Sequence, residues 1–309
     1  HLTEWQVMHG LRTRRHNLMR TEGIDIDFRF IEDIQDVEGI RRIVIRVSEG
    51  NIIVTGSEDS QLRYFIELQG VSEEIDTWSC RFRRAESIAI IEVIANDYVR
   101  IGKCSIFIPS HISDVEVHSS RGSMEIREIP ANVLAISDRG DISISNAKFV
   151  EVSSVNGNII VDRSEGCSAR SINGTIRCSR IAGSVQVESQ NSLVLMDQVE
   201  KNVAAVCDQG KIIARRVKGR VRLISNKGDI ELEVSGAFGG GEVQTYSGDI
   251  SIQLEYSSIE FRAETLSGRI EANFPTSASG IGPQRCTFRT GEGSRRLYVK
   301  SILGDIEIS

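Results

Sequence analysis

Residues 137–144 read SDRGDISI: a small polar residue, two variable residues, a glycine, and then alternating apolar positions. Segments of this form recur along the chain as SSRGSMEI, SDRGDISI, SVNGNIIV, SINGTIRC, SQNSLVLM, CDQGKIIA, SNKGDIEL, TYSGDISI, TLSGRIEA and SILGDIEI. Their turn positions are Gly122, Gly140, Gly157, Gly174, Ser192, Gly210, Gly228, Gly248, Gly268 and Gly304. The intervals are 18, 17, 17, 18, 18, 18, 20, 20 and 36 residues, so the last one spans two periods. A fixed period of this kind is the signature of a repeat architecture.

The apolar positions on both sides of each turn have a period of two, which is the spacing of a β-strand. Ile230 and Leu232 follow one turn by two and four residues, and Val221 and Leu223 precede it by seven and five. One unit is too small to bury both strands, so the units must stack and share a core. The sequence therefore predicts an all-β fold, a single-chain parallel β-solenoid of about ten rungs of 17–20 residues, right-handed by the usual connection rule.

The residue three places before each turn position is small and, except for Cys207, carries a hydroxyl. These residues are Ser119, Ser137, Ser154, Ser171, Ser189, Cys207, Ser225, Thr245, Thr265 and Ser301. By alternation they point inward, where a hydroxyl can bond backbone groups that the corner leaves unpaired. No histidine or carboxylate accompanies them at a fixed offset, so we interpret them as structural residues and not as nucleophiles.

Glycine at the turn position favours a left-handed conformation, in which a Cβ would cost about 1–2 kcal/mol. Ser192 is the exception, and it follows Asn191, a residue that tolerates positive φ. The sequence leaves open whether that corner has another shape or carries strain.

The chain before the repeats has a different character. Residues 41–110 contain longer strand-like runs with aromatic residues and predict a β-strand capping region ahead of a solenoid over residues 111–309. Residues 1–40 are predicted to be a basic, helical or irregular segment, with a short helix within LTEWQVMHGLRTRRHNLMR. Its candidate interface residues are Trp5, Arg12, Arg14, Arg15 and Arg20, which would be attracted to a partner or to an anionic membrane surface.

The last repeat unit ends the chain. Its inward residues Ile306 and Ile308 are followed only by Ser309, whereas a solenoid normally needs a cap over its last rung. An open rung exposes unpaired backbone groups. We therefore expect this terminal rung to contribute to an interface, either by self-association or with a protein partner.

Composition excludes several classes of function. The net charge is −6, which argues against a nucleic-acid partner. The six cysteines form no CxxC pair and have no histidine at metal spacing, so we interpret them as small buried hydrophobes whose redox state the sequence does not fix. Aspartates follow four turns, at Asp141, Asp229, Asp249 and Asp305, but other residues fill the same position elsewhere. We predict no metal, no cofactor and no catalytic residue.

Several of these motifs resemble the putative-adhesin family of β-strand-repeat proteins, also called toastrack domains. The resemblance spans about residues 41–309 and rests on IRVSEGNIIVTG, on the strand end Ile106–Pro109 and on the repeated Ser-x-x-Gly-Asp-Ile. It implies an envelope-associated bacterial or archaeal protein with adhesive, structural or signalling roles, and it supplies no catalytic residues.

The sequence leaves two functions open, together with a less favoured third. The first is a non-enzymatic, adhesin-like assembly subunit or scaffold at the cell envelope, and the second is a membrane-associated interaction or signalling module. A carbohydrate-active solenoid enzyme is the third, disfavoured because most turns are too short to build a cleft. The chain begins at His1, so we expect a segment upstream, and the compartment stays open.

Overall fold

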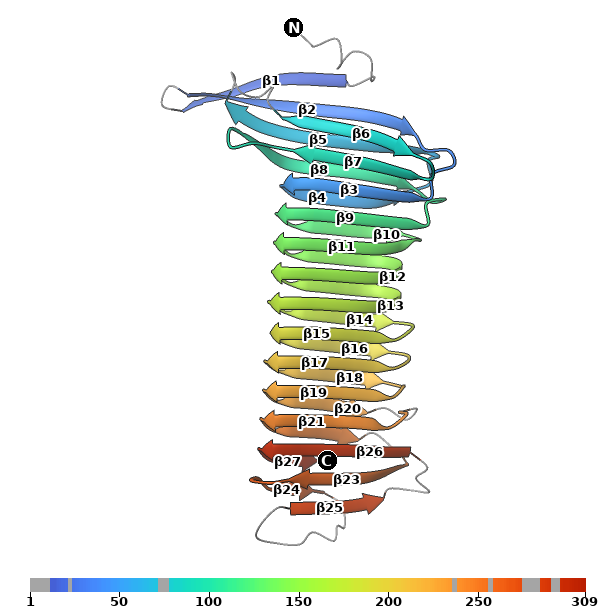
Figure 1. The fold of residues 1–309 in the computed structure, drawn as a ribbon, viewed down its shortest axis with the longest axis vertical. Coiled ribbons are helices and arrows are strands. Elements are labelled where there is room, and N and C mark those ends of the chain that lie inside the picture. The colour runs from blue at the N-terminus through green and yellow to red at the C-terminus, as the bar shows by residue number, and fades with distance from the viewer. Residues whose placement is uncertain are drawn as a thin grey trace. The chain divides into compact units, whose positions relative to one another are not determined.

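The structure is a computed structural model that describes residues 12–21, 24–71, 78–234, 238–254, 258–273, 284–289 and 295–309, with side chains described from residue 27 onward. Its internal contacts divide the chain into two compact units, His1–Val150 and Glu151–Ser309. Every regular element of the described residues is a β-strand (Figure 1). This confirms the predicted all-β class.

The first unit has eleven strands and part of a twelfth. They are β1 (Arg12–Thr21), β2 (Ile24–Asp36), β3 (Arg42–Glu49), β4 (Asn51–Ser57), β5 (Gln61–Val71), β6 (Ser79–Ala85), β7 (Ile88–Ile94), β8 (Val99–Pro109), β9 (Asp114–Arg121), β10 (Met124–Ile129), β11 (Asn132–Arg139) and β12 (Ile142–Asn156), which runs into the second unit. One series of pairings is β1–β2–β5–β8, all antiparallel, continued by β8–β4–β10–β12, all parallel. The other is antiparallel β6–β7 followed by parallel β7–β3–β9–β11.

The second unit consists of stacked rungs with two strands each. Its strands are β13 (Ile159–Asn173), β14 (Ile176–Ile181), β15 (Val185–Asn191), β16 (Val194–Val199), β17 (Val203–Gln209), β18 (Ile212–Val217), β19 (Val221–Lys227), β20 (Ile230–Val234), β21 (Gly241–Ser247), β22 (Ile250–Leu254), β23 (Ile259–Thr265), β24 (Ile270–Ala272), β25 (Gln284–Arg289), β26 (Arg295–Leu303) and β27 (Ile306–Ile308). One ladder is β13–β15–β17–β19–β21, and the other is β13–β14–β16–β18–β20–β22. All of these pairs are parallel, which confirms the predicted parallel solenoid.

The rungs do not stack entirely in chain order. The last rung of the chain, β26–β27, lies between the rung β21–β22 and the rung β23–β24 (Figure 1). At the turn positions, Gly304 therefore stacks between Gly248 and Gly268, out of chain order. Strand β25 then pairs antiparallel with β23, so the edge of that strand is covered.

The first unit shows the same device. The rung β3–β4 lies between β7–β8 and β9–β10, although β7 and β8 come later in the chain than β3 and β4. Antiparallel strands lie beyond it, with β6 on β7 and β5 on β8. In both units, then, a parallel ladder passes into antiparallel pairing, which removes the open parallel edge that would template aggregation.

The core is a column of the inward-facing residues that the alternation predicts. Ile212, Ala214, Val203 and Ala205 have at most 1% of their surface exposed, and the same positions are buried in most other rungs, although Ile270 and Ala272 of β24 are only half-buried. The register is constant along the stack, with Val203 opposite Val221 and Val185 opposite Val203. Each apolar residue therefore packs on its equivalent in the neighbouring rungs, which buries a continuous apolar column.

The turn glycines are required chiefly because backbones approach closely there. A Cβ on Gly228 would lie 1.9 Å from the carbonyl oxygen of Gly210, and one on Gly304 would lie 2.0 Å from that of Gly248. Gly228 also has a positive φ of 150°, whereas Gly304 does not have a left-handed φ. Ser192 is not among the positive-φ residues, so its corner differs in shape and is not strained in that way.

Unusual backbone that was not expected from the sequence recurs within the strands of each unit. Six non-glycine residues have φ between 52° and 57°, in the left-handed region: Glu128 and Asn146 in the first unit, and Arg163, Arg180, Gln198 and Arg216 in the second. Only Asn146 is of a type that favours this conformation. Two of the arginines bind an aspartate of the preceding rung through two nitrogens, Arg180 with Asp162 and Arg216 with Asp197.

The predicted N-terminal helix is wrong for the residues that the structure describes. Residues 12–21 form β1, which pairs with β2 from Arg12↔Glu32 to Thr21↔Ile24, and β2 itself occupies a stretch predicted to be helical or irregular. Pairing with a long neighbouring strand outweighs a local helical preference, which is worth well under 1 kcal/mol per residue. Residues 1–11 lie outside the described residues.

The inserted rung can be tested by disulfide trapping. Ser251 of β22 and Glu307 of β27 are register partners, and parallel partners lie about 4.8 Å apart, within the range for a disulfide. The pair Ser251→Cys with Glu307→Cys is expected to crosslink under mild oxidation, as seen by peptide mass mapping. The control pair, Ser251→Cys with Glu271→Cys, spans two rungs and should remain reduced. The opposite result would restore chain-order stacking.

The hydroxyl column gives a matched pair of variants in adjacent rungs. Thr245 donates to the carbonyl of Gly228 (3.1 Å), whereas the buried Oγ of Ser225, its register partner, has no hydrogen-bond partner. Thr245→Val should lower the free energy of unfolding by about 1 kcal/mol, and Ser225→Ala should leave it unchanged or raise it. Urea melts of the two variants measure this. Equal losses would contradict the assignment of hydrogen bonds within the column.

Candidate functional site

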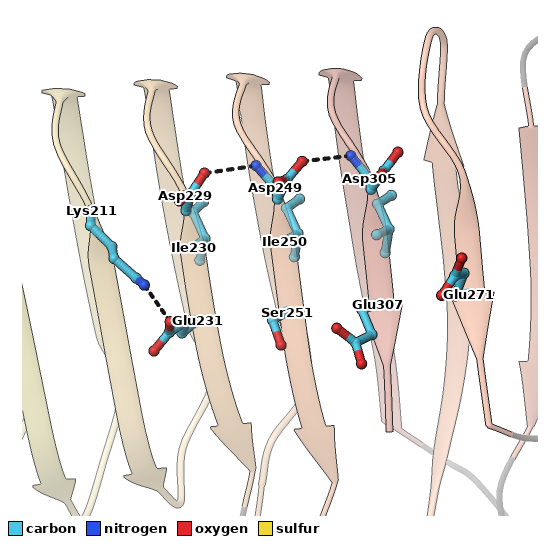
Figure 2. A pocket seen from close by; sticks show the side chains of 11 residues that line it. Lys211, Asp229, Ile230, Glu231, Asp249, Ile250, Ser251, Glu271, Asp305 and Glu307 are labelled. Atoms are coloured by element: carbon cyan, nitrogen blue, oxygen red, sulfur yellow. Dashed lines mark hydrogen bonds and ion pairs between the residues drawn. The ribbon is translucent and has the colours of Figure 1, made fainter.

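A row of carboxylates follows the turns of the last rungs of the second unit. Asp229, Asp249 and Asp305 each come directly after a turn glycine and directly before β20, β22 and β27 respectively. Their side chains point away from the apolar core and lie next to one another, because the inserted rung brings Asp305 beside Asp249 (Figure 2). Chain order alone would have placed Arg269 there.

Each aspartate of this row accepts a backbone hydrogen bond from the next rung. The N–H of Asp249 donates to Oδ1 of Asp229 at 3.0 Å, and the N–H of Asp305 donates to Oδ1 of Asp249 at 2.8 Å. The N–H of Arg269 in turn donates to Oδ1 of Asp305 at 2.7 Å. The carboxylates thus satisfy backbone donors that the corner leaves outside the ladder.

A second row of polar side chains runs beside the first, from one strand to the next across the sheet. Glu231, Ser251, Glu307 and Glu271 are successive register partners on β20, β22, β27 and β24. Glu231 is paired with Lys211, whereas neither Glu307 nor Glu271 forms an ion pair with a described residue. Together the two rows line a shallow hollow of about 280 Å³ with six carboxylates and one ammonium group.

The arrangement is better suited to binding than to catalysis. Figure 2 shows the acidic side chains projecting from neighbouring strands of one sheet, and a glycosidase needs its two carboxyl groups on either side of the scissile bond. No group of three or more histidine, cysteine or acidic residues in the described part of the chain is arranged to hold a metal ion. The hollow is an acidic surface whose three aspartates accept backbone hydrogen bonds.

The first unit contains a buried polar cluster of a different kind. Asp33 accepts hydrogen bonds from the hydroxyl of Tyr64 and from Nε2 of Gln35 (2.6 Å), and its other oxygen accepts the N–H of Ile34. Burial raises the pKa of Tyr64, so the phenol stays protonated and donates. Burial also raises the pKa of the nearby Cys80 thiol to about 12, which leaves it an unreactive thiol at neutral pH. The cluster is structural.

The structure places the candidate interface residues as follows. Arg12, Arg14, Arg15 and Arg20 lie on β1, and Trp5 lies outside the described residues. Ile306 and Ile308 are fully buried, with β22 on one side and β24 on the other. The terminal rung is therefore paired on both sides, and the interface expected there stays a prediction.

All six cysteines are unpaired and buried, consistent with small core residues. The Sγ atoms of Cys167 and Cys178 are in contact at 3.6 Å, and hydrogen bonding with burial raises the pKa of Cys167. No helix in the described residues is long and apolar enough to cross a membrane.

Residues 40–309 match the family model described as Toastrack DUF4097, which covers most of the chain and the whole of the repeat region. The chain belongs to the toastrack family. The match agrees with the resemblance seen in the Ser-x-x-Gly-Asp-Ile motif, and it also takes in the segment from residue 40 that precedes the regular repeats. No curated protein matched the toastrack chain.

Solved structures similar to this toastrack protein include three from bacteria. One is a putative cell adhesion protein from Clostridium sporogenes, at 14% identity and a TM-score of 0.25, covering 90% of this chain and 97% of that one. Another is a putative adhesin from Bacteroides fragilis, at 12% identity and a TM-score of 0.35, covering 91% and 97%. The third is a putative adhesin from Parabacteroides distasonis, at 9% identity and a TM-score of 0.40, covering 91% and 97%.

The role of the aspartate row can be tested at Asp249. Asp249→Ala removes the acceptor of the Asp305 N–H and is expected to lower the free energy of unfolding by about 1 kcal/mol. Asp249→Asn keeps an oxygen in that place and should stay within about 0.5 kcal/mol of the parent chain. Thermal or urea melts measure both. If Asn were as damaging as Ala, the negative charge and not the hydrogen bond would be what the turn requires.

Proposed function

We propose that this toastrack protein is a non-enzymatic, adhesin-like scaffold of the cell surface that displays binding surfaces along its rungs. The observation that carries the proposal is the arrangement of the acidic rows, whose side chains project in register from consecutive strands and do not converge on a reacting group. A repeated display of this kind suits adhesion or assembly, in which many weak contacts add up.

The fold supports the same role through rigidity. Each rung is held to its neighbours by continuous parallel ladders and by an apolar core that runs through the rungs. The described corners are short, and none of them forms the long loops from which solenoid enzymes build a cleft. Family membership and the putative cell adhesion protein among the similar structures support a cell-surface location.

The proposal predicts a measurable location and activity in the native organism. Antibody labelling of intact cells, with and without surface protease treatment, should find the protein outside the cell. A deletion strain should attach less to surfaces or to other cells, and the wild-type gene should restore attachment.

Catalysis is tested separately with a variant. Wild-type protein and the double variant Glu271→Gln with Glu307→Gln should both be inactive on a panel of polysaccharides and glycosides. Hydrolysis by the wild-type protein that the double variant lacks would overturn the non-enzymatic assignment, whatever the location of the protein.

A further inference from the structure

Strand β2 buries charged residues and exposes apolar ones. Its buried positions hold Asp27, Arg29 and Asp33, each with at most 5% of its surface exposed, together with Ile31. Its outward positions include Phe30 and Ile34, which are 40% and 43% exposed. A sheet with one solvated face normally shows the reverse pattern, so the outer face of β2 calls for an explanation.

The register of β2 is fixed, so this exposure is not a sliding error. Its pairing with β5 runs without a break from Ile26↔Val71 to Asp36↔Gln61, and Asp33 lies opposite Tyr64, to which it is hydrogen-bonded. A slip by one residue would bury the phenylalanines and turn the acidic residues to solvent. The hydrogen bonds to Asp33 hold the chain in the register that keeps the apolar residues outside.

The apolar surface continues across three strands. Phe65 of β5 lies opposite Glu32 of β2, and its ring meets that of Phe107 of β8 edge-on, with centroids 5.9 Å apart. A hollow of about 370 Å³ opens on this face, lined by Phe30, Phe65, Glu32, Glu67, Lys103 and Ser105 among others. The outer face of β2–β5–β8 is thus an apolar surface with a recess, the usual form of an interaction site.

The charged side chains described on β2, β5 and β8 of this face are balanced in number. Glu32, Asp36 and Glu67 are acidic, and Arg63, Arg100 and Lys103 are basic. Arg63 pairs with Asp59 at 3.8 Å, whereas the register partners Glu67 and Lys103 form no ion pair with a described residue. An anionic membrane would meet the three carboxylates and a strongly basic partner would meet the three cations. A second copy related by a two-fold axis offers an acidic group for each basic one.

The size of the face agrees with such an occupant. β2 has 13 residues, and β5 and β8 have 11 each. At about 3.4 Å per residue and about 4.8 Å between strands, three such strands cover on the order of 500 Å² before side-chain relief is counted. A standard interface buries about 800 Å² on each partner, so most of a stable interface fits on this face.

We propose that the outer face of β2–β5–β8 is a self-association surface on which two copies of the chain pack sheet against sheet. Phe30, Ile34, Phe65 and Phe107 supply its apolar contacts, and Glu32, Arg63 and Glu67 lie in register between them. This goes beyond the proposed scaffold function and does not depend on it, because it requires only the first unit.

Sedimentation velocity at about 10 μM tests the proposal with a matched pair of variants. The wild-type chain should sediment as a dimer. Ile34→Arg replaces an apolar contact with a second cation opposite Arg63 and should weaken dimerisation at least tenfold. Ile94→Arg is the control, because Ile94 is similarly exposed (44%) but ends β7 in the other ladder, and this variant should dimerise like the wild type. Circular dichroism melts of both variants establish that they fold.

Three outcomes would overturn the proposal. The first is a wild-type chain that stays monomeric at that concentration, whether the face is bare or covered by another segment of its own chain. The second is a dimer that Ile34→Arg leaves intact, since the contact would then lie elsewhere. The third is a monomer that floats with anionic phospholipid vesicles unless Ile34 is changed to Arg, which would assign the face to a lipid surface.

Discussion

The close approach of one turn to the next is the constraint on which the repeat depends. At the turn position the backbone of one rung lies so near the carbonyl of its neighbour that a Cβ would stand about 2 Å from the oxygen, as at Gly140 and Gly210. This proximity allows the strands on either side to pair residue for residue. The parallel ladders, the stacked apolar core and the outward rows of carboxylates all follow from that shared register.

However many rungs are stacked, the last rung at each end of a solenoid has an unpaired edge. In both units the order of the rungs changes near such an end. In each, a rung is placed between two rungs that follow one another in the chain, and antiparallel strands lie outside. The same rearrangement positions chemistry, because the acidic hollow exists only where β27 has been brought beside β22.

The acidic hollow and the β2–β5–β8 sheet differ in what their polar groups do. The aspartates of the acidic hollow are engaged in backbone hydrogen bonds, so much of their polarity serves the turns. On β2 the polar groups of the inner face are instead buried, and Asp33 with Tyr64 fixes the register that leaves Phe30 and Ile34 outside. A hydrogen-bonded carboxylate therefore stabilises the turns of the acidic hollow. On β2 a hydrogen-bonded carboxylate fixes which side chains reach the surface.

The sequence alone determined the repeat, the strand alternation and the buried column, because these depend on local spacing that recurs in every rung. The sequence of β2 also alternates between apolar and charged residues. That alternation does not reveal which of the two faces of the strand is buried. Only the tertiary structure decided that the charged face of β2 is inside, that residues 12–21 form a strand, and that Ile306 and Ile308 lie in an interior rung. Each of these depends on which distant segment becomes the neighbour. Which distant segments pair depends on the difference in free energy between whole arrangements of the chain. A local sequence pattern does not contain that information.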